Sequence, residues 1–409
     1  MTINNVEKKD ARILLLEGIH ESAIKILNKA GFKNIDTRKV ALPEEELVKI
    51  IPEYHLLGIR SATHLTERIF EAAHNLMAVG AFCIGTNQVD VNAAMWRGIP
   101  VFNAPFSNTR SVAEVIIAEI IFLMRGIIQR NSDAHRGIWS KTADSSYEIR
   151  GKTLGIIGYG NIGSQLSVLA ESLGMRVQFY DIINKLPLGN AVQVPTLSQL
   201  LSTSDIVTLH VPETPLTKNM ISSKQFTLMK KKSLLINASR GSVVDIPALV
   251  EALRSEQLRG AAIDVFPVEP KSKNEPFQSP LCEFENVILT PHIAGSTQEA
   301  QENIGFEVSD KIAKYFLTGA TMGAVNFPQV SLPLEEGKHR VLHIHKNIPG
   351  VLSNINQVFS AGNMNIAGQY LQTNDSIGYV VIDLDGDYDQ MALEMLRQVK
   401  GTISVRSVH

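Results

Sequence analysis

Residues 154–163, LGIIGYGNIG, constrain the fold more than any other segment of the chain. The first four are apolar enough for a buried strand, and glycines at 158, 160 and 163 follow the pattern of a dinucleotide-binding turn. Gly158 allows a tight turn, Gly160 lets the backbone approach a pyrophosphate, and Gly163 packs helix against strand. We expect the next helix, beginning with Asn161 and Ile162, to bind phosphates through its N–H groups and positive dipole end.

An acidic residue follows the glycine turn at about the distance expected for a carboxylate that binds the adenosine ribose. Residues 177–180 form a second apolar strand that ends at Asp181, 18 residues beyond Gly163. A carboxylate there would accept hydrogen bonds from the adenosine ribose and would repel a 2′-phosphate. The sequence therefore predicts NAD as the cofactor in preference to NADP, and the alternative is an ordinary glycine-rich turn.

The composition is that of a globular protein with several domains. Of the 409 residues, 44% are hydrophobic and 20% are charged, and the length suggests two or three domains. A net charge of −2 gives no electrostatic reason to expect nucleic acid or an anionic membrane as a partner. Cys83 and Cys282 are the only cysteines, so we expect no disulfide framework and no metal site.

The sequence pattern favours a cytoplasmic location. The first residues, MTINNVEKKDAR, lack the apolar core of a secretion signal. The most apolar segment, 112–124, is too short to span a bilayer and is interrupted by Glu114 and Glu119. We expect it to be a buried helix that begins with a capping box formed by Ser111 and Glu114.

Strand and helix patterns alternate through most of the chain, which indicates an α/β protein with doubly wound parallel sheets. In the first sheet we expect strands at 13–17, 56–60, 76–79 and 101–103. A second run begins near Gly151, includes a strand at 262–265, and is followed by a long helix at 298–316 that could return the chain to the first domain. The last 70 residues follow a separate βαββαβ pattern, which is ferredoxin-like.

Three polar residues follow strands of the second run. Arg240 comes after LLIN, Glu269 after AAIDVF and His292 after VILT. Ligands bind at the carboxyl ends of strands in an open α/β sheet, so these side chains could converge on one crevice. Taken singly, each would more often be a solvated surface residue, but their placement after successive strands favours a catalytic group.

Oxidation of a secondary alcohol with NAD has a use for each residue type. A histidine is the natural base for the hydroxyl proton, and a carboxylate beside it would orient the ring and stabilise the imidazolium. A guanidinium can hold a substrate carboxylate by two parallel hydrogen bonds.

Six segments of the chain resemble those of the D-isomer-specific 2-hydroxyacid dehydrogenases. They are GIIGYGNIG, INASRGSVVDIPAL, AAIDVFPVEP, LTPHIAGST, FCIGTNQVD and FNAPFSNTRSVAE. The resemblance covers essentially the whole chain, is closest to bacterial members that act on 3-phospho-D-glycerate, and extends to a C-terminal ACT domain with the turn NIPGVL. It implies that Arg240 holds the substrate, His292 is the acid/base and Glu269 is its partner. Ala238 and Asp264 would lie at the cofactor, Asp264 near the nicotinamide carboxamide.

The resemblance also implies a domain order, in which a Rossmann-like domain is inserted in a flavodoxin-like domain. The expected parts are a substrate-binding domain at 1–107, an NAD-binding domain at 108–297, a return to the substrate-binding domain at 298–326, a linker at 327–338 and the ACT regulatory domain at 339–409.

The implied reaction is the NAD-dependent oxidation of 3-phospho-D-glycerate to 3-phosphohydroxypyruvate, which opens L-serine synthesis. A substrate with two anionic groups needs more cations than Arg240, and the expected substrate-binding residues are Lys39, Arg60, Asn108 and Lys141. Related enzymes often have a second arginine where this chain has Ala62, which leaves the strength of phosphate binding open.

The ACT resemblance implies feedback inhibition by L-serine, bound between paired domains of a homotetramer. The expected effector-binding residues are His345, Asn347 and Asn365, although Asn347 could simply make the turn before Pro349. Two other functions stay open: a dehydrogenase of another 2-hydroxy acid such as 2-hydroxyglutarate, and a non-catalytic protein that senses dinucleotides.

Overall fold

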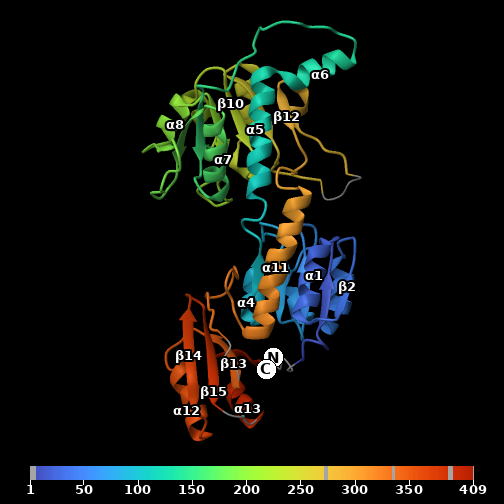
Figure 1. Ribbon diagram of the computed structural model, residues 1–409, viewed down its shortest axis with the longest axis vertical. Helices are drawn as coiled ribbons and strands as arrows, with labels where there is room; N and C mark the ends of the chain where they lie inside the picture. The colour runs from blue at the N-terminus through green and yellow to red at the C-terminus, as the bar shows by residue number, and fades with distance from the viewer. Residues whose placement is uncertain (1–5, 271–274, 334–336, 386–389, 409) are drawn as a thin grey trace. The chain divides into compact units, whose positions relative to one another are not determined.

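A computed structural model describes residues 6–270, 275–333, 337–385 and 390–408. The chain divides into two compact units. Unit 1 combines the residues up to Ser107 with those from Gln301 onward, and unit 2 is Asn108–Ala300. Unit 1 is therefore built from the first and last parts of the chain, which are blue and orange-red in Figure 1.

Unit 1 contains a parallel sheet of five strands in the order β2-β1-β3-β4-β5. The strands are β1 (Arg12–Leu15), β2 (Asn34–Thr37), β3 (Leu56–Ile59), β4 (Ala78–Ala81) and β5 (Val101–Asn103). The helices that follow them are α1 (Glu21–Ala30), α2 (Glu44–Ile50) with the 3₁₀ turn η1 (Ile51–Glu53), α3 (Glu67–Ala72) and α4 (Val91–Trp96). This strand order is the flavodoxin-like one, as expected.

Helices cover both faces of this sheet. On one face α1 packs beside the long helix α11 (Gln298–Thr318), through apolar residues such as Leu27, Ile304 and Val308. On the other face α2, α3 and α4 pack through a second apolar cluster that includes Leu47 and Phe70. The expected return of the chain to the first domain is therefore made by α11.

The last part of unit 1 is an antiparallel sheet in the order β14-β15-β13-β16, which is ferredoxin-like. Its elements are β13 (Lys338–Lys346), α12 (Val351–Ala361), β14 (Ile366–Thr373), β15 (Ile377–Asp385), α13 (Gln390–Gln398) and β16 (Thr402–Val408). Helices α12 and α13 cover one face. The other face packs on the rest of unit 1, where Tyr379 donates to the Gly319 carbonyl at 2.6 Å and buried Arg340 donates to the Thr318 carbonyl at 3.0 Å.

Unit 2 contains a parallel sheet of seven strands in the order β12-β11-β10-β9-β6-β7-β8. The strands are β6 (Thr153–Ile157), β7 (Arg176–Tyr180), β8 (Val192–Gln193), β9 (Ile206–Leu209), β10 (Ser233–Asn237), β11 (Leu258–Ile263) and β12 (Val287–Leu289). Its helices are α5 (Thr109–Arg125), α6 (Ile127–His135), α7 (Asn161–Ser172), α8 (Leu197–Thr203), α9 (Ser223–Leu228) and α10 (Ile246–Arg254), with 3₁₀ turns η2 (Gly241–Val243) and η3 (Pro280–Glu283). The order is Rossmann-like, and the predicted fold class is confirmed.

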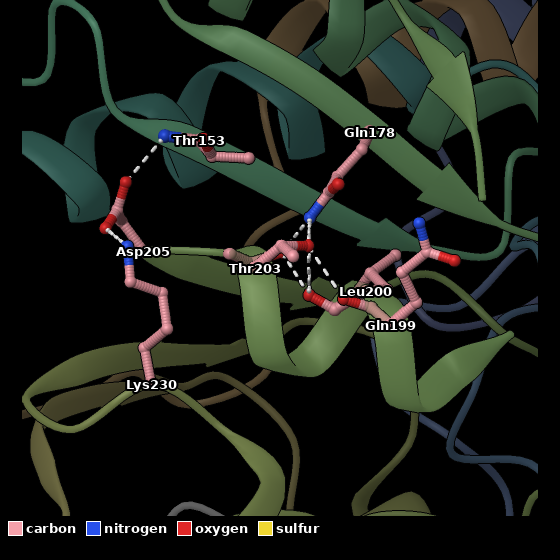
Figure 2. Close-up of polar contacts among 8 residues, drawn as sticks. Thr153, Gln178, Gln199, Leu200, Thr203, Asp205 and Lys230 are labelled. Atoms are coloured by element: carbon pink, nitrogen blue, oxygen red, sulfur yellow. Dashed lines mark hydrogen bonds and ion pairs between the residues drawn. The ribbon is translucent and has the colours of Figure 1, made fainter.

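Polar side chains form hydrogen bonds and an ion pair near the amino ends of the central strands in unit 2 (Figure 2). The Asp205 carboxylate, just before β9, accepts from the Thr153 N–H at 2.8 Å and pairs with Lys230. The Gln178 amide on β7 donates to Thr203 Oγ1 at 2.6 Å at the end of α8. These bonds satisfy half-buried polar groups at the end of the sheet opposite to the glycine turn.

Several local predictions were wrong. The predicted capping box does not form: α5 begins at Thr109, the Ser111 hydroxyl bonds Thr297 Oγ1 at 2.8 Å, and the Glu114 carboxylate accepts from Arg110. Strand β4 starts at Ala78, two residues later than expected, and β11 starts at Leu258, four residues earlier.

The expected linker lies partly outside the described residues, because 334–336 are not described. None of the described helices is long and apolar enough to cross a membrane.

The Glu119 carboxyl on α5 is buried in unit 2 at a cost in stability. Glu119 is 4% exposed, and both its oxygens are buried with no hydrogen-bond partner among the described residues. Burial raises its pKa to about 8, while the unfolded carboxyl ionises above an ordinary pKa of 4.5. The folded state therefore keeps a proton that the unfolded state loses, and this acid lowers stability as the pH rises from 4.5 to 8.

We expect Glu119→Gln to remove this pH dependence. The variant should match the wild type near pH 4.5 and exceed its free energy of unfolding at pH 8, by on the order of 4 kcal/mol if Glu119 accounts for the whole shift. Denaturant unfolding at both pH values measures the difference. Glu114→Gln, an exposed site on the same helix, is the control and should show no such gain. An equal difference at the two pH values would contradict the assignment.

Candidate active site

The glycine turn connects β6 to α7 at the carboxyl end of the sheet. Gly158 has a φ of 91°, and a Cβ there would lie 2.6 Å from the His210 carbonyl oxygen. A Cβ on Gly163 would lie 2.4 Å from the Gly158 oxygen, so helix and turn approach closely. Among the described residues no atom lies within 4 Å of a Cβ placed on Gly160, so this face of the turn is open.

The groups around the turn fit a dinucleotide. The first N–H groups of α7, at Asn161, Ile162 and Gly163, have no acceptor within the helix and are available to phosphate. Asp181 follows β7, where its carboxylate accepts from the Tyr159 N–H at 2.9 Å and from the Ile183 N–H at 3.2 Å. Each of its oxygens keeps a further lone pair for a ribose hydroxyl.

The predicted catalytic residues in the loops after β11 and β12 meet in the structure. His292 Nδ1 lies 3.0 Å from Glu269 Oε2, and Glu269 Oε1 accepts from the Phe266 N–H at 3.1 Å. With Nδ1 engaged by the carboxylate, the ring nitrogen available for proton exchange with a substrate is Nε2.

The pKa values of this pair move in opposite directions. The hydrogen bond to Glu269, assisted by the charge of that carboxylate, raises the pKa of His292 although burial opposes it. Burial alone would raise the pKa of Glu269, but the bonds from His292 and the Phe266 N–H, with the charge of Arg240, leave it below its ordinary value. The pair is therefore arranged to stabilise an imidazolium beside a carboxylate.

Asp264 fixes the turn that carries His292. The turn places His292 at a φ of 54°, and its N–H donates to the Asp264 carbonyl at 2.8 Å. The Asp264 carboxylate accepts from Thr290 Oγ1 at 2.6 Å and from the N–H groups of Ile293 and Ala294 at 2.8 and 3.0 Å. Asp264 is 2% exposed, so its visible role is to hold this turn, and its contact with a nicotinamide stays a prediction.

Arg240 lies in the turn after β10, and its charge acts on both members of the His292–Glu269 pair. Buried Asn237 shapes this turn by donating to the Arg240 carbonyl at 3.0 Å. A Cβ on Gly241 would lie 2.0 Å from the Phe266 carbonyl carbon, so this turn packs directly on the loop that carries Glu269. Ala238, half-buried between Asn237 and Arg240, belongs to the same turn.

The predicted substrate-binding residues are divided between the units. Exposed Lys39 and half-buried Arg60 belong to unit 1, and Asn108 and exposed Lys141 belong to unit 2. Asn108 lies beside Gly295, where a Cβ would be 2.1 Å from its amide nitrogen, and its buried Oδ1 has no partner within the described structure. No group of three or more His, Cys, Asp and Glu side chains among the described residues could hold a metal ion.

The predicted effector-binding residues lie at two ends of the ferredoxin-like sheet. Asn347 directly follows Lys346, which pairs with Ile377, and Asn365 directly precedes Ile366, which pairs with Leu384. The two positions are therefore separated along β15 by roughly 23 Å, at ~3.3 Å per residue. His345 is 3% exposed and lies under Gly378, so a Cβ on that glycine would be 2.3 Å from its Nε2.

Sequence reasoning missed Asn237 as a positioning residue and gave Asp264 only a cofactor role. Both stand at or just after the ends of apolar strands, where a polar residue in an otherwise apolar run was the available signal. Their partners lie in other loops, which the local sequence does not identify.

Two family models match the chain. Residues 117–294 match the NAD binding domain of D-isomer specific 2-hydroxyacid dehydrogenase, and residues 341–407 match an ACT domain like that of the AHAS small subunit. The seven-stranded domain of unit 2 is thus an NAD-binding domain.

Solved structures share this fold over about three quarters of the chain. The D-lactate dehydrogenase from Aquifex aeolicus complexed with NAD and lactic acid is 28% identical, with a TM-score of 0.66, and the match covers 78% of this chain and 100% of that chain. D-2-hydroxyisocaproate dehydrogenase has a TM-score of 0.69 at 23% identity over 77% of this chain and 100% of that chain, which shows the fold alone.

Curated relatives match from end to end. The D-3-phosphoglycerate dehydrogenase of Escherichia coli strain K12 is 59% identical over 407 residues, 99% of each sequence. Those of Haemophilus influenzae and Dictyostelium discoideum are 58% and 48% identical, over 99% and 98% of each sequence. The chain therefore belongs to the D-3-phosphoglycerate dehydrogenase family, NAD-dependent oxidoreductases that carry an ACT domain.

Proposed function

We propose that this chain oxidises the C2 hydroxyl of 3-phospho-D-glycerate to give 3-phosphohydroxypyruvate, and so opens L-serine synthesis. The observation that supports this best is the 3.0 Å pair of His292 and Glu269 within the electrostatic reach of Arg240, at the carboxyl end of an NAD-binding sheet. Relatives that carry the name of this enzyme match the whole chain.

Each residue has a role in the proposed reaction. His292 Nε2 takes the proton of the C2 hydroxyl, and the Glu269 carboxylate stabilises the imidazolium that results. Arg240 binds the substrate carboxylate and polarises the oxygen at C2. Bound NAD, held by residues 158–163 and Asp181, would accept the hydride that leaves C2.

The remaining anionic end of the substrate needs cations of its own. We assign it to Lys39 and Arg60, with Lys141, and give Asn108 a polar contact with the substrate. Arg60 is half-buried and directly follows β3, and ligands of open α/β sheets bind at the carboxyl ends of strands. The position at 62 is an alanine, so the second cation must come from another segment.

We expect His292→Ala to lower kcat/KM for 3-phosphoglycerate by about 10²–10⁴-fold, since a general base is removed. Steady-state NADH production measures this, with His74→Ala, an exposed histidine of unit 1, as the control. The assay is run with 2-hydroxyglutarate in parallel. Higher kcat/KM on 2-hydroxyglutarate would reassign the substrate, and full activity of the variant would remove His292 from the mechanism.

Glu269→Gln should shift the acid limb of the kcat/KM profile to lower pH. Because the bond to Glu269 raises the pKa of His292, loss of the carboxylate lets the free base persist at lower pH. The maximal rate should fall as well, by about tenfold or more, because the imidazolium loses its counter-charge. A profile from pH 5 to 9 checks both effects, and an unshifted limb would contradict the role given to Glu269.

We also propose that L-serine inhibits the enzyme by binding where two ACT domains meet in a homotetramer. Asn347 and Asn365 are both exposed, and their roughly 23 Å separation exceeds the length of one amino acid. Asn347 of one copy and Asn365 of another could bind the same ligand if the domains pair. Their amides suit the carboxylate and ammonium groups of an amino acid.

Serine at millimolar concentration should inhibit the wild type, and Asn347→Ala should raise the concentration for half inhibition by about tenfold, since a hydrogen bond to a charged ligand group is lost. Inhibition curves at fixed 3-phosphoglycerate measure the shift. Asn28→Ala, an exposed asparagine on α1, is the matched control. Rates that do not respond to serine would overturn the effector site.

A further inference from the structure

A single carboxylate organises the loop that carries Arg60. Glu17 Oε1 accepts from the N–H groups of Arg60 and Thr63, at 3.0 and 2.9 Å. Its Oε2 accepts from the Ala62 N–H at 2.9 Å. Three N–H groups of one loop converge on one anion, as they do in loops that bind anionic ligands. Here the anion belongs to the protein, so Glu17 fixes the loop before any ligand binds.

Gln88 holds the same peptide from its other side. Its Nε2 donates to the Arg60 carbonyl at 2.6 Å, and the residue is 8% exposed. Both backbone groups of Arg60 are therefore bound by side chains from distant parts of unit 1. The only hydrogen bond of the Arg60 guanidinium is a long one, 3.5 Å from Nη1 to the Glu17 carbonyl, among the residues that the structure describes.

The Glu17 backbone lies against the segment of Lys39. Glu17 has a φ of 62°, a left-handed conformation that is unusual for this residue type. Its N–H donates to the Val40 carbonyl at 3.3 Å, and that of Gly18 donates to the Arg38 carbonyl at 3.0 Å. Such a backbone persists only where the surroundings hold it, and these are the residues on either side of Lys39.

We propose that Glu17 is a positioning residue for substrate binding, because its carboxylate and backbone, with the Gln88 amide, set the places of Arg60 and Lys39. The inference rests on the proposed function, in which those two cations bind an anionic end of the substrate. Glu17 itself does not touch the substrate: its oxygens are engaged by the three N–H groups of the loop.

The charge of Glu17 and its proposed positioning role predict opposite changes in the KM for 3-phosphoglycerate when the carboxylate is replaced by an uncharged side chain. Removing a negative charge near a site for an anion would by Coulomb attraction alone lower the KM for 3-phosphoglycerate. A Gln side chain has one acceptor oxygen and an NH₂ group that would face loop N–H donors, so a positioning role predicts a higher KM. We expect Glu17→Gln to raise this KM by about tenfold, with kcat and the KM for NAD unchanged.

Three further variants make the test decisive. Glu17→Gly removes the carboxylate but relieves the left-handed backbone, so it should fold and still raise the KM for 3-phosphoglycerate. Hydrogen exchange of the amides at 60–63 should be faster in it than in the wild type. Gln88→Leu should raise the same KM, and Glu46→Gln, an exposed acid on α2, should change nothing.

The outcomes separate this inference from the proposed function. If Arg60→Ala raises the KM while Glu17→Gln and Glu17→Gly do not, Arg60 binds substrate and the role of Glu17 is overturned. Unchanged exchange at 60–63 in Glu17→Gly also overturns it. If Arg60→Ala leaves the KM unchanged, the proposed substrate role of Arg60 fails first and this inference falls with it.

Discussion

The Asp264 carboxylate is the interaction on which the arrangement of the proposed catalytic residues depends. Pairing of β11 with β12, with Ile263 opposite Leu289, brings the two following loops together only approximately. Asp264 then accepts three hydrogen bonds from the second loop and leaves His292 in a left-handed conformation. That conformation costs free energy and would not persist without such bonds. The 3.0 Å approach of His292 to Glu269 follows from this turn, and with it the raised pKa of the histidine.

The order of the strands decides where this turn lies relative to the cofactor-binding turn. In unit 2 the chain runs from β6 to β7 on one side and returns to β9 on the other side of β6. Ligands of open α/β sheets bind at such a reversal, outside the carboxyl ends of the strands. Gly158 lies there against the His210 carbonyl, just after β9. The strands that lead to Arg240, Asp264 and His292 continue outward from β9, so all their loops emerge at the same edge as the glycine turn.

Patterns that act over a few residues were enough to predict the architecture, but not the bonds that shape the site. The glycine spacing and the apolar strands predicted both parallel sheets. The short β2 was missed because NIDT has little apolar signal, and the capping box at Ser111 was wrong because Thr297, far along the chain, takes that hydroxyl. Glu17 was missed for the same reason: its partners at 60–63 are more than forty residues away. The roles of Arg240, Glu269 and His292 stay predictions that the geometry supports.

The carboxylates of Glu17 and Asp264 bind loop groups of the protein and do not pair with Arg60 or Arg240. Both arginines are therefore available to an anionic substrate. The carboxylates of Glu17 and Asp264 each accept three hydrogen bonds from the protein, and none of these comes from an arginine side chain. Within the described residues neither Arg60 nor Arg240 takes part in an ion pair, and the guanidinium of each donates only to a neutral carbonyl. An arginine already paired with a carboxylate would have to exchange that partner for the substrate and would gain little. Because N–H groups and a hydroxyl, and not arginines, bind the acids here, both guanidinium forks stay available to bind carboxylate or phosphate.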